Sequence, residues 1–159
     1  MDDLTDKVIP TDETATPTEG DLREIPREDW LLQDVVRLIN QVDGMSLGVT
    51  LVVGGGVVTG DLISVKNFFH EYGKLWKEGF TSKAAELAEM FDQQWREFGD
   101  RAFEEIKAAK PRLFGYVHLR NARYVLGSTF VPTAGGMLWR GRISEVAGFS
   151  IGSFGAPQV

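Results

Sequence analysis

The chain of 159 residues contains no cysteine, only two histidines and no hydrophobic run of the length that crosses a membrane. Without cysteine, disulfides, thiolate metal sites and cysteine nucleophiles are excluded, and the composition suits a reducing cytoplasm. The N-terminus lacks the basic segment and following apolar run of a signal peptide. We therefore expect a cytoplasmic protein that has no membrane partner.

The acidic charge is concentrated at the N-terminus. Residues 1–25 hold eight acidic and two basic residues, so this segment carries the whole net charge of -6. The segment is also poor in apolar residues, which predicts a disordered acidic tail. We expect a single domain over residues 26–153, followed by a short tail at 154–159.

The first half of this domain predicts a helix and a pair of strands. Pro26 suits the first turn of a helix, and apolar residues at helical spacing follow until Gly44. The alternation from Leu47 to Val53 predicts a strand, a glycine triplet at 54–56 predicts a turn, and residues 57–63 predict the returning strand. Gly60, inside that strand, indicates a bend or a close backbone approach.

Residues 65–110 change to a helical period and predict a helical hairpin. Thr81 or Ser82 can cap its second helix, Pro111 ends it, and Gly99 is expected to weaken it.

Strand patterns return at residues 114–119, 122–126 and 137–151, with a loop at 127–136. We expect the last pair of strands to be joined by a corner at Arg140–Gly141. The predicted fold class is α+β: a small, strongly bent antiparallel β-barrel with an N-terminal helix and a helical-hairpin insertion between strands 2 and 3.

No pattern in the chain predicts catalysis. The glycine triplet lies between strands rather than before a helix, so a hairpin turn is favoured over a phosphate loop. His70 and His118 lack the spaced partners of a metal site, and no nucleophile-elbow motif occurs. We predict no catalytic residue, no cofactor and no metal ion, and the protein is not expected to be an enzyme.

Two groups of residues are candidate interaction sites. Residues 110–142 contain six basic and no acidic residues, whereas residues 78–105 contain eight acidic and three basic residues. These charges suit a solvated surface, an anion or RNA site, or a head-to-tail contact between copies. Aromatic side chains at helical spacing suit a core or a partner groove. The candidate interaction residues are Arg120, Arg123, Trp139, Arg140, Arg142, Phe68, Phe69, Trp76 and Trp95.

Three segments, in this order, resemble the gas vesicle accessory protein U (GvpU) family. They are Gly60-Asp61-Leu62-Ile63-Ser64, His118-Leu119-Arg120-Asn121-Ala122-Arg123, and Trp139-Arg140-Gly141-Arg142-Ile143-Ser144-Glu145-Val146-Ala147-Gly148-Phe149. The resemblance implies a non-catalytic accessory protein that assists the assembly, organisation or clustering of gas vesicles in the cytoplasm.

At the level of the fold, the same segments resemble an Sm-like barrel, through Val49-x-Leu51-x-x-Gly54, Val58-x-Gly60-x-Leu62 and Leu138-Trp139-Arg140-Gly141. In RNA-binding Sm-like proteins, an Asp and an Asn precede the third strand, and the helical hairpin replaces them here. Only Arg140–Gly141 remains of that RNA-contact pattern, so an RNA-binding module is the alternative function. The favoured partners are further copies of the chain and gas vesicle proteins.

Overall fold

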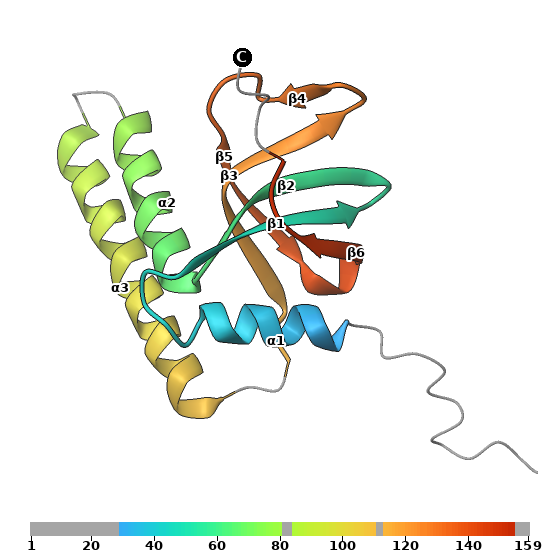
Figure 1. Ribbon diagram of the computed structural model, residues 1–159. Coiled ribbons are helices and arrows are strands. Elements are labelled where there is room, and N and C mark those ends of the chain that lie inside the picture. The colour runs from blue at the N-terminus through green and yellow to red at the C-terminus, as the bar shows by residue number, and fades with distance from the viewer. Residues whose placement is uncertain (1–28, 81–83, 111–112, 155–159) are drawn as a thin grey trace, which may run out of the picture.

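The computed structural model describes residues 29–80, 84–110 and 113–154, which form a six-stranded antiparallel sheet with a helix and a helical hairpin packed against it (Figure 1). The α+β class is therefore confirmed. In chain order the elements are α1 (Trp30–Ile39), β1 (Ser46–Val53), β2 (Gly56–Ile63), α2 (Val65–Gly79), α3 (Ala85–Ala109), β3 (Tyr116–Leu126), β4 (Thr129–Val131), β5 (Met137–Arg142), the short 3-10 helix η2 (Ile143–Glu145) and β6 (Val146–Ile151).

Helix α1 begins later than the sequence predicts. Asp29 is its N-cap, and its carboxylate accepts hydrogen bonds from the backbone N–H groups of Leu31 and Leu32 at 2.8 and 3.2 Å. The predicted start at Pro26 lies outside the described residues. At the other end, the side chain of Asn40 accepts the backbone N–H of Val65 at 2.9 Å, which ties α1 to the start of α2.

The predicted hairpin of β1 and β2 is confirmed. Gly54 and Gly55 adopt positive φ angles of 57° and 79° in its turn, a conformation that favours glycine. The close approach predicted at Gly60 is also present, since a Cβ atom there would lie 2.9 Å from the carbonyl oxygen of Arg120 on β3.

The later strands differ from the prediction. Residues 116–126 form one long strand, β3, which continues through a bulge at Asn121 in place of the two strands predicted at 114–119 and 122–126. The predicted loop at 127–136 contains β4. The predicted corner at Arg140–Gly141 is wrong, because η2 makes the turn between β5 and β6. Gly141 lies within β5 instead, where its missing side chain leaves room for the indole ring of Trp139.

The sheet is not closed into a barrel. Its strands follow the order β4-β3-β2-β1-β6, with β5 paired to β3. Among the described ranges, β5 and β6 do not pair with each other. Before η2, β5 pairs with β3, and after η2, β6 pairs with β1. The open sheet corrects the predicted barrel, and the Sm-like resemblance stays a prediction from sequence.

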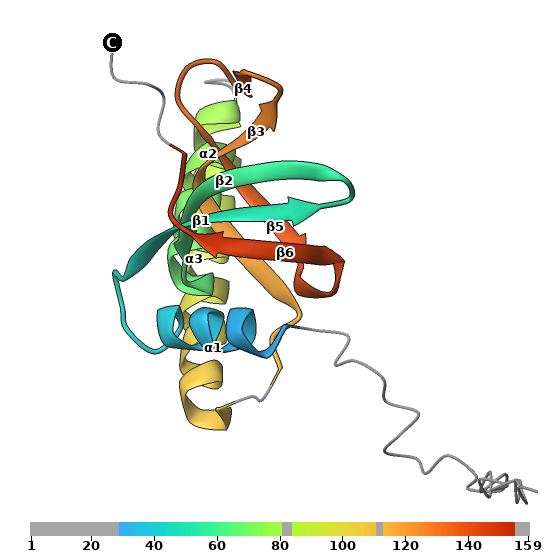
Figure 2. The same cartoon turned by 45° about the vertical axis from the view of Figure 1, so that its right-hand side comes forward.

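Two apolar cores lie on either side of this sheet. The first contains the inner face of α1 and the strands, with Leu32, Leu51 and Leu119 fully buried. The second lies between the sheet and the predicted helical hairpin of α2 and α3, which is confirmed. Figure 2, like Figure 1, shows α1 running beneath the strands and crosswise to the two helices of the hairpin.

Glycines allow the two helices of the hairpin to approach closely. A Cβ atom at Gly73 would lie 3.0 Å from the carbonyl oxygen of Asp92, and one at Gly99 would lie 3.0 Å from Cβ of Phe69. Gly99 is therefore a buried contact point rather than only the weak point that its helix propensity predicts. The predicted caps Thr81 and Ser82 and the terminating Pro111 lie outside the described residues.

Candidate interaction surfaces

Arg140 on β5 is held in place by two aromatic neighbours. Its Nε donates a hydrogen bond to Nε2 of His118 at 3.2 Å, and its guanidinium lies 3.4 Å from the ring centroid of Tyr116. Both partners come from β3, where His118 pairs directly with Arg140. The residue stays exposed, so β3 orients one positive charge outward from the edge of the sheet.

His118 is a buried, neutral member of the second core. Its ring lies 4.7 Å from the ring of Phe68, and burial, with a smaller contribution from the charge of Arg140, lowers the pKa of His118 from 6.5 to about 3. Acceptance of a hydrogen bond at Nε2 places the ring proton on Nδ1.

The other predicted arginines do not form one group with Arg140. Arg120 makes an ion pair with Glu71 of α2 at 3.1 Å, which joins β3 to the hairpin of the same chain. Arg123 lies farther along β3, with its guanidinium 5.0 Å from the ring centroid of Phe130. Arg142 is exposed at the end of β5. All of these arginines except Arg142 have a described partner within the chain, but Arg140 and Arg142 are exposed, whereas Arg120 and Arg123 are half-buried.

Trp139 belongs mainly to the first core rather than to an exposed surface. Its ring packs against that core and over Gly141, and its Nε1 donates to the hydroxyl of Tyr124 at 3.0 Å. This hydrogen bond satisfies the polar end of the indole. Trp139 therefore stabilises the pairing of β5 with β3.

The aromatic residues of the hairpin divide into a buried and an open part. Phe68 and Phe69 are buried where α2 meets the sheet, with Phe103 of α3 beside them. Farther along the hairpin, Trp76 stays 37% exposed although its ring lies 5.2 Å from that of Phe91. Phe80 stacks on Phe91 at 5.9 Å.

We define the aromatic face as the side of the hairpin that carries these rings. Ring contacts connect its members across the two helices, and Leu87 lies one helical turn before Phe91 on the same side. Its members are Tyr72 and Trp76 from α2, Phe80 directly after α2, and Leu87, Phe91, Trp95 and Phe98 from α3.

Trp95 is the half-buried centre of the aromatic face. Its ring stacks on Phe69 at 5.5 Å and meets Tyr72 edge-on at 5.3 Å. Within the described part of the chain, Nε1 of Trp95 is a buried donor without a hydrogen-bond partner. The indole thus connects the buried and the open halves of the hairpin.

A hollow of about 360 Å³ opens on the aromatic face and is lined by Tyr72, Leu75, Trp76, Gly79 and Phe80. A Cβ atom at Gly79 would have no neighbouring atom within 4 Å, so the absence of a side chain there contributes to the hollow. A second hollow of about 510 Å³ shares Leu75 and extends between α2 and the β3–β5 side of the sheet, past Glu71 and Arg120. The lining of the larger hollow mixes charged and apolar residues, whereas the lining of the first contains no charged residue.

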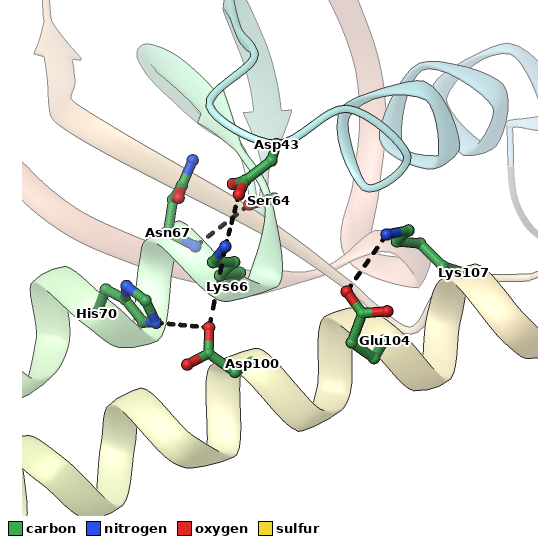
Figure 3. Close-up of polar contacts among 8 residues, drawn as sticks. All are labelled: Asp43, Ser64, Lys66, Asn67, His70, Asp100, Glu104 and Lys107. Atoms are coloured by element: carbon green, nitrogen blue, oxygen red, sulfur yellow. Dashed lines mark hydrogen bonds and ion pairs between the residues drawn. The ribbon is translucent and has the colours of Figure 1, made fainter.

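The opposite side of the hairpin is charged, as Figure 3 shows for its lower part. Lys66 forms an ion pair with Asp43 of the α1–β1 connection and lies 4.0 Å from Asp100 of α3, which His70 also contacts at 2.9 Å. The hydrogen bond to Asp43 raises the pKa of Lys66, and Lys66 lowers the pKa of Asp43. The pair with Asp43 joins the hairpin to the rest of the domain, and the contacts of Asp100 join α2 to α3.

Neither a metal cluster nor a membrane helix is found in the described ranges. No group of three or more histidine, aspartate or glutamate side chains there could hold a metal ion, and no helix among these residues is long and apolar enough to cross a membrane. What the structure offers is a small α+β domain with three distinct surfaces: an exposed arginine pair, a charged helical face and an aromatic face. These surfaces are the candidate interaction sites of the domain.

The comparison with known families identifies the class more closely. A family model described as "Gas vesicle protein GvpU-like" matches residues 29–154. The chain belongs to this family, which confirms the resemblance found in the sequence, and the family is one of gas vesicle accessory proteins. No curated protein and no solved structure matches the chain.

Several features of these surfaces have weak signals in the sequence. The contact between His118 and Arg140 joins residues 22 positions apart, and only the register of β3 and β5 brings them together. Likewise, the pairing of β2 with β3 brings together Asn121 and Asp61, and the side-chain amide of Asn121 donates to the carboxylate of Asp61 at 2.8 Å. Gly79 gave no signal at all, because a glycine at the end of a helix is ordinary.

Proposed function

We propose that this protein is a non-catalytic organiser of gas vesicles that works in the cytoplasm by self-association and by contact with gas vesicle proteins. The observation that carries the proposal is the separation of exposed charge: Arg140 and Arg142 project from β5, while the exposed face of α3 carries acidic residues. Membership of the gas vesicle family supports the setting of this activity.

The self-association contact joins the arginine pair of one copy to the acidic face of α3 of another. Glu86, Glu89 and Glu97 are exposed on that helix, and residues 26–159 as a whole hold equal numbers of acidic and basic residues. A neutral body with separated charges attracts its own kind at short range. Because the two patches differ, the contact is heterologous and can continue from copy to copy.

The structure gives less support to RNA binding, the alternative function. Arg120 and Arg123 are engaged by Glu71 and Phe130 of the same chain, and phosphate binding needs several basic side chains free to contact one strand. Two exposed arginines on β5 offer a smaller electrostatic footprint than RNA recognition requires.

The test replaces the arginine pair by glutamine. The expected result for Arg140→Gln/Arg142→Gln is a smaller assembly in sedimentation velocity, with the parent assembly also shrinking as salt rises. The matched control is Lys74→Gln/Lys107→Gln, which removes the same charge from the exposed helical surface and should leave the assembly size unchanged.

Two results would contradict the proposal. One is an unchanged assembly size in the arginine variant at low salt. The other is tight, salt-dependent binding of single-stranded RNA by the parent that the arginine variant loses, since that result would favour the RNA-binding module.

A further inference from the structure

Several large apolar side chains on and beside the aromatic face are exposed to solvent. On this face Trp76, Leu87 and Phe98 are 37–41% exposed, and beside it Leu75 of the hollow's lining and Met90 of α3 are 50% and 56% exposed. Taking about 200 Å² for a whole large side chain, this amounts to roughly 450 Å² of apolar surface on each copy. Two such faces pressed together would bury roughly 900 Å² before their rims are counted, which approaches the size of a specific interface.

The seven members of the aromatic face are uncharged, and the charge described nearest to their rings is the guanidinium of Arg101, 5.9 Å from the ring centroid of Phe98. The charged partners of the two helices, such as Lys77 with Glu89 and Arg96 with Asp92, lie about a quarter turn or more away by helical spacing. An apolar occupant that covers both helices at once is therefore required.

The aromatic face contains both the hollow at Gly79 and an exposed side chain, Leu87, at the same height along the hairpin. Across the hairpin, Trp76 and Phe80 lie beside Phe91, and Lys77 pairs with Glu89. This antiparallel register places Leu87, one turn before Phe91, at the same height as Gly79, whose missing side chain opens the hollow. The hollow and the projecting Leu87 thus lie level with each other on neighbouring helices.

We propose that the aromatic faces of two copies pack together about a twofold axis parallel to the hairpin, forming a four-helix bundle. Such an axis sets α2 of one copy against α3 of its partner and keeps the height of every residue. The partner's Leu87 then enters the hollow at Gly79, and the reverse contact forms at the same time. This is the self-complementarity that a twofold interface requires.

This contact is independent of the arginine contact proposed above, and the two have opposite responses to salt. The arginine contact continues from copy to copy and weakens as salt screens it, whereas the aromatic contact closes after two copies and is apolar. Together they would join closed pairs into an extended network, which is a physical basis for clustering.

The first experiment is sedimentation velocity of the full chain at about 1 M salt, where charges are screened within about 3 Å. The parent should sediment as a dimer. In Gly79→Leu the new side chain fills the hollow, so the dissociation constant should rise about tenfold or more. The matched control is Gly148→Leu, another glycine with open space around it, which should remain a dimer.

The second experiment exploits the absence of cysteine from the chain. Gly79→Cys and Leu87→Cys proteins, mixed and oxidised, should form a disulfide-linked dimer that neither protein forms alone, and Gly148→Cys mixed with Leu87→Cys should not. This measurement tests the proposed dimer even if Gly79→Leu does not fold.

A parent that is monomeric at high salt would overturn the proposal, as would a Gly79→Leu variant that still dimerises and a mixture that does not cross-link. Loss of binding to purified gas vesicles by Gly79→Leu, with dimerisation intact, would assign the face to a vesicle protein instead. None of these outcomes depends on the arginine pair, so the proposed function can fail or hold separately.

Discussion

The two halves of the helical hairpin use the same kind of residue for different purposes. Near the sheet, Phe69 is 8% exposed and lies among Tyr72, Trp95 and Phe98. Two turns farther along α2, Trp76 is 37% exposed beside an open hollow. Both positions belong to one apolar stripe, so the difference arises from what the sheet covers and not from the helices themselves.

The comparison teaches that stability and binding are separated along the hairpin. The half near the sheet is closed by Phe68, Phe103 and Ile63 and holds the hairpin to the domain. The far half contributes little to that core, and its exposed rings are available to a partner. Substitutions in the two halves should therefore have different consequences.

The largest expected effect comes from replacing one large ring by alanine in each half of the hairpin. Phe69→Ala should lower the free energy of unfolding by about 3–5 kcal/mol, because it leaves a cavity among packed rings. Trp76→Ala should cost less than half of that, because much of its ring already meets solvent. Urea denaturation of both variants measures the difference, and equal losses would show that the far half is also core.

The next effect concerns His118, whose ring packs on Phe68 at the sheet end. Its folded pKa of about 3 lies below the ordinary value of 6.5. As pH falls below about 6.5, the unfolded chain takes up a proton that the folded chain does not. The stability that His118 contributes above that pH is therefore lost at roughly 1.4 kcal/mol per pH unit, until the folded ring also titrates.

His118→Gln keeps an acceptor for Arg140 but removes this titration. The difference in unfolding free energy between parent and variant should therefore shrink from pH 7 to pH 4 in matched urea titrations. A difference that stays constant with pH would mean that the histidine is not neutral in the folded protein.

The sequence predicts most of the helices and strands, but it does not predict that the sheet stays open. Periodicity and turn glycines predicted the hairpins of β1–β2 and α2–α3, because local spacing determines them. The open sheet and the turn at η2 depend on which strands β5 and β6 pair with, and that pairing joins residues far apart. Gly141 misled the prediction because a glycine that accommodates Trp139 has the same sequence signal as one at a corner.

The candidate surfaces were predictable as residue types but not as groups. All four arginines were identified from charge, yet only the fold shows that Glu71 and Phe130 engage Arg120 and Arg123. Likewise, helical spacing predicted an apolar stripe with Phe68, Phe69 and Trp76 on the first helix of the hairpin and one with Trp95 on the second. Which of them the sheet covers follows from the tertiary arrangement, which no local pattern contains.

The smallest expected effect compares two glycines of α2. At Gly73 a Cβ atom would lie 2.7 Å from a carboxylate oxygen of Asp92 and 3.0 Å from its carbonyl oxygen, whereas at Gly79 it would meet no atom within 4 Å. Gly73→Ala should therefore destabilise the fold by about 1–3 kcal/mol, since α3 must move away. Gly79→Ala should change stability by no more than about 0.5 kcal/mol. Thermal and urea melts of the two variants, made under dilute conditions to limit association, give the comparison. An equal loss in both would mean that the far half of the hairpin is as tightly packed as the half against the sheet, and the aromatic face would then have no room for a partner.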